Sequence, residues 1–216
     1  MRRYSYLALL IVIGTALIFF LVSIVWSGKK QADAKTELPA IEFRATGARG
    51  FTNKTKALEN AREIRINGGA GYVDYDDEWF VIEKLGEGDM HFSAESIEIN
   101  LTSTEHKESF DALIASFAEN VSTLQSLREK PANNAPAEAL RLYNELGKTV
   151  SVFDRTQQAA SSLVYSKVLV AANKQLLALF LLSTKKSGDN IVSAIEYCIC
   201  SIKFTYIELV TTLRSR

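Results

Sequence analysis

Residues 50–85 have the sequence GFTNKTKALENAREIRINGGAGYVDYDDEWFVIEKL, and this stretch decides how the first half of the chain folds. Asn53 is placed to cap a helix that carries alanine and aliphatic residues along one side, and Gly68 and Gly69 end that helix. Two short apolar runs then flank a pair of aspartates, a pattern typical of a β-hairpin. The stretch therefore predicts one helix followed by two antiparallel strands.

Strands are also predicted on both sides of this stretch. Residues 41–45 alternate between apolar and charged side chains, as a half-buried strand does, and Gly47 and Gly50 allow a turn after it. A second alternation covers residues 97–101. The order of these elements is that of a split βαβ unit, so residues 40–101 are predicted to form a small α/β domain of ferredoxin-like type.

Several positions of the same stretch follow a known pattern. An aromatic residue ends the first strand, small residues lie inside the helix and after it, and an aromatic-x-valine triplet lies in the third strand. The positions are Phe51, Asn53, Lys54, Ala57, Gly68, Gly69, Ala70, Tyr72, Trp79, Phe80 and Val81. In these positions the stretch resembles the SPOR domain, the sporulation-related repeat of bacterial envelope proteins.

The resemblance implies a domain that binds peptidoglycan glycan strands lacking stem peptides, outside the membrane and often at division or sporulation septa. It also implies that the glycan contacts lie on the face of the sheet. The chain departs from the family pattern at two places: a glutamine common in the first strand is missing near Gly47, and the second helix is reduced to residues 90–96. A ferredoxin-like domain without glycan affinity is the competing interpretation.

The start of the chain contains a predicted membrane anchor. Residues 7–26 are twenty residues without a charge, preceded by arginines and followed by lysines. At about 1.5 Å per residue, a helix of this length crosses a hydrocarbon core of roughly 30 Å. A cleaved secretory signal is the alternative, because Ala32-Asp33-Ala34 has the form of a cleavage site, but the apolar run is longer than such signals usually have. We therefore predict a tail at residues 1–6, a transmembrane helix at 7–26 and a linker at 27–39.

Charge limits the class of partner and leaves the orientation of the anchor open. The chain has 25 Lys and Arg against 25 Asp and Glu, and the part beyond the linker is slightly acidic. This balance argues against nucleic acid as a partner. A literal positive-inside count of the basic residues near each end places the large domain in the cytoplasm, but long domains cross largely regardless of charge, so the orientation stays open. The SPOR resemblance favours a single-pass plasma-membrane protein with its C-terminal domain outside the cytoplasm.

The second half, residues 102–216, is predicted to be helical throughout. Thr102 opens it with a capping-box pattern, and Pro136 lies where the first turn of a later helix tolerates proline. Apolar side chains then recur at spacings of three and four along three or four helices with short connections. This pattern predicts an antiparallel helical bundle.

Two features of the bundle sequence have an ordinary structural interpretation. Residues 168–182 are apolar, but Lys174 and Gln175 in the middle favour a central bundle helix over a second membrane span. Cys198 and Cys200 are two residues apart, so on a helix they point away from each other and neither pair nor share a metal ion. Both are predicted to be buried as small apolar side chains.

The sequence carries no pattern of catalytic or metal-binding residues. His91 and His106 lie on either side of a predicted strand, without a cysteine or paired carboxylate at ligand spacing. The acidic residues 74–78 lack the glycine and the distal glutamate of a calcium loop. We therefore expect no cofactor, no metal ion and no enzymatic activity.

Two functions are compatible with these features. The first is a bitopic bacterial envelope protein whose degenerate SPOR-like module binds peptidoglycan glycan or localises an assembly during division or sporulation. Its predicted contacts are Tyr75 and Trp79, because flat aromatic rings stack on the C–H faces of sugars, although Trp79 is as well explained by packing into the sheet. The second is a membrane-tethered interaction protein whose helical bundle docks a protein partner without binding glycan.

Overall fold

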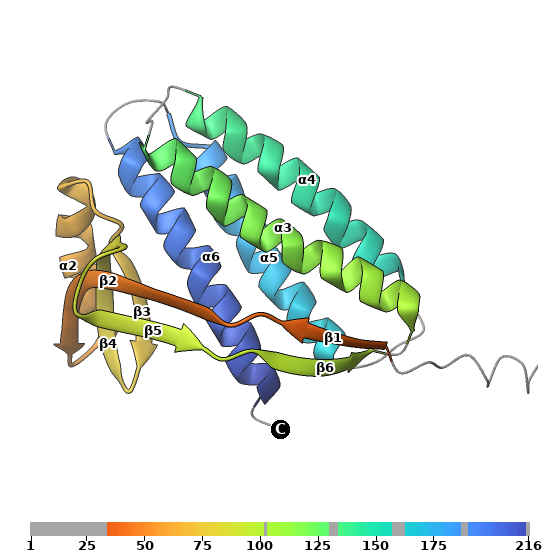
Figure 1. Ribbon diagram of the computed structural model, residues 1–216. Helices are drawn as coiled ribbons and strands as arrows, with labels where there is room; N and C mark the ends of the chain where they lie inside the picture. The colour runs from red at the N-terminus through yellow and green to blue at the C-terminus, as the bar shows by residue number, and fades with distance from the viewer. Residues whose placement is uncertain (1–33, 102, 130–133, 157–162, 187–189, 215–216) are drawn as a thin grey trace, which may run out of the picture.

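The fold is α+β, with two antiparallel sheets beside a bundle of long helices (Figure 1). It is seen in a computed structural model that describes residues 34–101, 103–129, 134–156, 163–186 and 190–214. The transmembrane helix predicted at residues 7–26 lies outside the described residues. The α+β class and the antiparallel pairing of the strands agree with the sequence analysis.

The larger sheet has four strands and one crossing helix. Its elements, in chain order, are β2 (Ile41–Phe51), α2 (Lys54–Ile66), β3 (Tyr72–Asp76), β4 (Glu78–Leu85) and β5 (Met90–Ala94). The strand order in space is β3-β4-β2-β5, and all neighbours are antiparallel. Strand β4 therefore lies between the two strands that α2 connects, which is the split arrangement expected from the sequence.

Helix α2 begins and ends where the sequence predicts. The side chain of Asn53 accepts a hydrogen bond from a backbone N–H of the first turn at 3.0 Å, and Gly68 adopts a φ of +89° just after the helix. On its inner side the helix buries Ala57 and Ala61 against Val81 of the sheet. The small side chains at this contact allow the helix to lie close to the strands.

The connection from β4 to β5 crosses the backbone of β2. Strand β4 ends with Leu85 opposite Ala45 on one edge of β2, and β5 begins with Met90 opposite the same Ala45 on the other edge. A Cβ atom on Gly88 would lie 2.1 Å from the carbonyl oxygen of Ala45, and Gly88 has a φ of +136°. Only glycine fits this crossing, because any side chain would collide with the strand beneath it.

Residues 90–96 do not form the reduced second helix that the SPOR resemblance implies. They contain strand β5, in which Met90, Phe92 and Ala94 are buried and the residues between them are exposed. This alternation is the side-chain period of a strand, so the prediction of a short helix is wrong. The second half of the sheet therefore lacks the crossover helix of the ferredoxin-like pattern.

Gly47 and Gly50 do not form the predicted turn. They lie within β2, where the register with β4 shifts after Thr46 and again after Ala48. A Cβ atom on Gly47 would lie 2.0 Å from the carbonyl oxygen of Val81. The glutamine missing near Gly47 therefore has a steric explanation, because the backbone of β4 occupies the space that a side chain needs.

Four long helices form the second half of the chain. They are α3 (Thr104–Glu129), α4 (Ala135–Thr156), α5 (Leu163–Ser183) and α6 (Ile191–Arg214). Each helix runs antiparallel to the next, and α3 also contacts α6, so the four close into a bundle (Figure 1). The predicted apolar stripes face inward, with Phe110, Leu124, Leu146 and Phe153 fully buried. This part of the fold agrees with the sequence analysis.

A second sheet extends the first along the helices. It consists of β1 (Ala34–Leu38) and β6 (Ile97–Leu101), which pair antiparallel. Their register continues that of β2 and β5, so the four strands form one long two-stranded ribbon that is interrupted near Pro39 (Figure 1). The hydroxyl of Tyr206 on α6 donates to the carbonyl oxygen of Pro39 at 2.8 Å, which holds this interruption against the bundle.

Residues 34–38 form strand β1, whereas the sequence analysis predicts that they belong to a linker at residues 27–39. Thr36 and Leu38 are buried, whereas Lys35 and Glu37 are exposed. The hydroxyl of Thr36 donates to the carboxylate of Asp111 on α3. The prediction is wrong for residues 34–38 because an inward-facing position is filled by threonine, which is polar but finds a hydrogen-bond partner.

Helix α6 covers the face of the larger sheet opposite α2. The ring centroid of Phe204 lies 5.3 Å from that of Phe43, 5.0 Å from that of Tyr72 and 4.8 Å from that of Phe92. Phe204 is only 7% exposed, and a single hydrophobic core runs from the sheet through the bundle. The regions 40–101 and 102–216 are therefore packed against each other through α6.

Among the described residues, one helix is long and apolar enough to cross a membrane, and it is Val164–Ser183 within α5. Tyr165, Val168 and Leu179 on its inner side are buried in the bundle. The helix thus occupies the place in the bundle that the sequence analysis expects for residues 168–182.

Gly88→Ala should destabilise the fold more than Gly86→Ala. Both glycines have a positive φ, but a Cβ atom meets the backbone of β2 only at position 88, whereas nothing lies within 4 Å at position 86. Urea unfolding of both variants measures the difference. Equal losses of stability would show that the close crossing over β2 is absent in solution.

Phe204→Ala should lower the free energy of unfolding by about 3–5 kcal/mol, because it removes a buried ring that several other rings contact. Phe180→Ala is the matched control, since this ring is largely exposed on α5, and its expected loss is about 1 kcal/mol or less. Thermal or urea unfolding checks both values. Similar losses for the two variants would contradict the packing of α6 on the sheet.

Candidate functional site

The β3–β4 hairpin brings together the two predicted contact residues, Tyr75 and Trp79. They form a cross-strand pair with ring centroids 5.2 Å apart and ring planes inclined by 59°. Tyr75 is 57% exposed, whereas Trp79 is half-buried and packs against the cluster that contains Ala57. The ammonium of Lys54 lies 5.5 Å from the centre of the Trp79 ring. Trp79 is thus held by the fold, and it supports the open ring of Tyr75.

A polar groove of about 740 Å³ opens beside Tyr75. It lies between β3 and β5 on one side and α5 and α6 on the other, with buried phenylalanines beneath carboxylates, hydroxyls, a histidine and a lysine. The residues that line it are Asp74, Tyr75, Asp76, Phe80, His91, Phe92, Ser93, Lys174, Phe204, Ile207, Glu208, Thr211 and Thr212. Of the two predicted contact residues, Tyr75 lines the groove and Trp79 does not.

Asp74 is fixed in the groove wall by two hydrogen bonds. The hydroxyl of Tyr72 donates to its Oδ2 at 3.1 Å, and the backbone N–H of Tyr75 donates to its Oδ1 at 2.9 Å. Burial raises the pKa of Tyr72 well above its usual range, and the charge of Asp74 raises it further. Tyr72 therefore stays a neutral hydrogen-bond donor, and Asp74 keeps a defined orientation with lone pairs left to accept from a ligand.

Two further polar side chains of the groove, His91 and Lys174, have exposed carboxylate partners. The Nε2 of His91 lies 2.8 Å from a carboxylate oxygen of Glu42, and the Nζ of Lys174 lies 2.5 Å from that of Glu208. Exposed ion pairs of this kind contribute at most about 1 kcal/mol to stability. Their side chains can therefore turn toward a ligand at little energetic expense.

Both faces of the larger sheet are covered, which changes where a glycan could bind. The SPOR resemblance implies contacts on the sheet face, but α2 packs on one face and Phe204 of α6 on the other. The sheet surface that stays open to a polysaccharide lies at the hairpin end, where Tyr75 is 57% exposed. The groove is the place where residues of β3 and β5 meet solvent beside α6.

The described residues include no group of three or more His, Cys, Asp or Glu side chains that could hold a metal ion. His91 lies on β5, whereas His106 is buried in α3. Cys198 and Cys200 are both free and buried, as the sequence analysis predicts. Burial raises the pKa of Cys198 to about 12 and that of Cys200 well above its usual range, so neither thiol is a reactive thiolate.

Comparisons with protein-family models, with curated proteins and with solved structures find no match to this chain. The groove itself is therefore the basis for an inference about function. The sequence analysis missed most of it, including His91, Ser93, Glu208 and Thr211, because these residues come from segments that only the packing of α6 on the sheet brings together.

A buried carboxylate lies on the same helix, away from the groove. Glu196 on α6 is 3% exposed, and one of its oxygens lies 3.0 Å from a guanidinium nitrogen of Arg128 on α3. Burial raises the pKa of Glu196, and the charge of Arg128 opposes this only in part. A carboxylate that is less acidic in the folded state stabilises the fold when it is protonated.

Glu196 should therefore make the free energy of unfolding decrease as pH rises from the ordinary glutamate pKa of 4.5 through the raised pKa of Glu196. The reason is that the folded state holds this proton more tightly than the unfolded state does. Glu196→Gln should remove this effect. Glu138→Gln is the control, because the hydrogen bond from Arg141 lowers the pKa of Glu138 and gives an effect of opposite sign. Urea unfolding measures the effect of Glu196 above pH 4.5 and that of Glu138 below pH 4.5, and an unchanged profile for Glu196→Gln would refute the assignment.

Proposed function

We propose that this chain is a membrane-anchored envelope protein that binds a glycan in the groove beside the β3–β4 hairpin. The observation that carries the proposal is the groove of about 740 Å³, with Tyr75 among its lining residues. Glycan sites combine a flat aromatic surface for C–H faces with fixed polar groups for hydroxyls. The exposed ring of Tyr75 supplies the first on the α2 side of the hairpin, where it contacts Trp79, and Asp74, Ser93 and Thr211 supply the second in the groove.

The sequence supports the choice of glycan and the location. The resemblance of residues 50–85 to the SPOR domain implies peptidoglycan glycan strands without stem peptides as the ligand. Residues 7–26 would anchor the protein as a single span in the plasma membrane, with the described residues on the outer side. The groove contains hydrogen-bonding groups but no paired nucleophile and base, so we propose binding without catalysis.

The alternative is a tethered interaction protein whose helical bundle docks a protein partner. One observation favours it: six of the nine large hydrophobic side chains that are exposed among the described residues lie on α4 and α5. Exposed apolar side chains gathered on one part of a surface indicate a contact site. This alternative requires no occupant of the groove.

The full-length protein in detergent should sediment with purified peptidoglycan, and more strongly after an amidase has removed the stem peptides. Tyr75→Ala should weaken this binding by about 2- to 10-fold, which is the effect expected from losing one stacked ring. The matched control is Phe180→Ala, which removes another exposed aromatic ring that does not line the groove. Equal binding of the two variants and the unchanged protein, or no binding by any of them, would refute the proposal.

A further inference from the structure

The outer side of α5 is apolar, which is unusual for a helix at the surface of a bundle. Val170, Leu177, Phe180 and Leu181 are each between 45% and 57% exposed. The spacing of seven residues from 170 to 177 and of four residues from 177 to 181 places three of them along one line of the helix. We call these four residues the α5 face.

The α5 face extends onto the neighbouring helix. The ring of Tyr143 on α4 lies 5.8 Å from that of Phe180, centroid to centroid, and the exposed Leu140 lies one turn before Tyr143. Helix α5 contains no acidic residue, and its only charged side chains are Lys167 and Lys174. The face is therefore an apolar strip that the exposed Asn173 and Lys174 interrupt between Val170 and Leu177.

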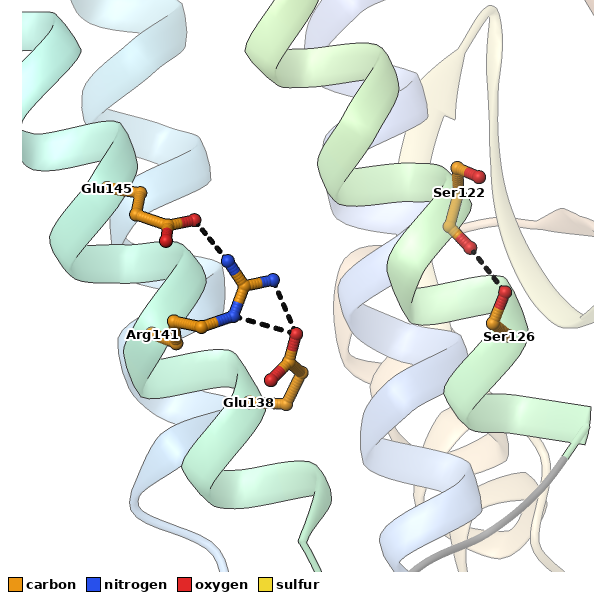
Figure 2. A network of polar contacts seen from close by, with 5 residues as sticks. All are labelled: Ser122, Ser126, Glu138, Arg141 and Glu145. Atoms are coloured by element: carbon orange, nitrogen blue, oxygen red, sulfur yellow. Dashed lines mark hydrogen bonds and ion pairs between the residues drawn. The ribbon is translucent and has the colours of Figure 1, made fainter.

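The outer sides of α3 and α4 are different. On α4 the guanidinium of Arg141 is paired with both Glu138 and Glu145 (Figure 2). On α3 the hydroxyl of Ser126 donates to the backbone carbonyl oxygen of Ser122 (Figure 2). These groups are the charged and polar side chains expected next to water, although α4 also exposes Leu140 and Val152. Four of the six large hydrophobic side chains that α4 and α5 expose lie on α5.

The place where the described chain begins limits how far the bundle can lie from the proposed anchor. Strand β1 starts at Ala34 and runs along the bundle, and only residues 27–33 separate it from the proposed anchor. Seven residues span at most about 25 Å, whereas α5 with its 21 residues is about 30 Å long. On the proposed anchoring, the bundle therefore stays within its own length of the lipid surface.

We propose that the α5 face lies against the lipid surface of the membrane in which the chain is anchored. Its apolar side chains reach the boundary between headgroups and acyl chains, as those of an interfacial helix do. Lys174, and Lys185 just beyond the helix, lie beside the face and meet anionic lipid phosphates. The bundle then lies flat on the membrane, and α5 keeps its inner side in the protein core.

The full-length protein, reconstituted into vesicles of equal parts phosphatidylethanolamine and phosphatidylglycerol, allows a direct test. Leu177→Cys is labelled with bimane, and its fluorescence is measured with and without lipids that carry a nitroxide quencher near the headgroup. Ser126→Cys on the polar side of α3 is the matched control. Cys198 and Cys200 are buried, so the unsubstituted protein shows how little label they take up.

The proposal expects strong quenching at position 177 and little at position 126. It also expects that Val170→Glu with Leu181→Glu abolishes quenching at position 177, because two carboxylates exclude the face from the lipid. Equal quenching at both positions, or none at position 177, would overturn it. Bimane at position 177 that is protected from water but not quenched would mean that a protein, including a second copy of the chain, covers the face.

The outcome is independent of the glycan assay, because none of the substituted residues lines the groove. Loss of glycan binding with retained quenching would leave the lipid contact in place. Quenching also requires that the protein is in the vesicle, so flotation of the vesicles is measured in parallel. Protein that fails to float with the vesicles would refute the anchor and the lipid contact together.

Discussion

The contact between α6 and the larger sheet is the interaction on which the rest of the structure depends. Phe204 brings the rings of Phe43, Tyr72 and Phe92 into one cluster. Without it, the sheet would expose an apolar face and the bundle would expose one side of α6. The same contact creates the groove, because the walls of the groove are the parts of β3, β5 and α6 that extend past the cluster.

The groove and the α5 face meet at Lys174. This residue lies on α5 beside the apolar strip, and its ammonium is paired with Glu208, which lines the groove with it. A protein with these two surfaces would hold a polar ligand close to the lipid headgroups.

The local elements could be predicted from the sequence because their signals are local. Asn53 caps α2, the glycines after it end the helix, and the paired aspartates mark the hairpin. The α3 and α4 stripes are visible as spacings of three and four. The exposure of Tyr75 could also be predicted, because this aromatic residue lies next to the polar tip of the hairpin.

The rest depends on contacts between distant segments. The buried Thr36 hides the alternation of β1, and the family resemblance implies a helix where β5 replaces it. The groove requires side chains from β3, β5, α5 and α6, and no spacing in the sequence connects them. The packing of α6 on the sheet could not be predicted either. An apolar stripe predicts that a helix face is buried, but it does not indicate which surface packs against that face.

The position of α6 at the end of the described chain has a consequence for synthesis. Strands β2 to β5 are made long before α6, yet one face of their sheet is completed only by its residues. Proteins generally fold domain by domain as the chain emerges, but here the first half cannot bury its apolar face until the last helix has been translated. The apolar face of the sheet would therefore stay exposed while α3, α4 and α5 are synthesised.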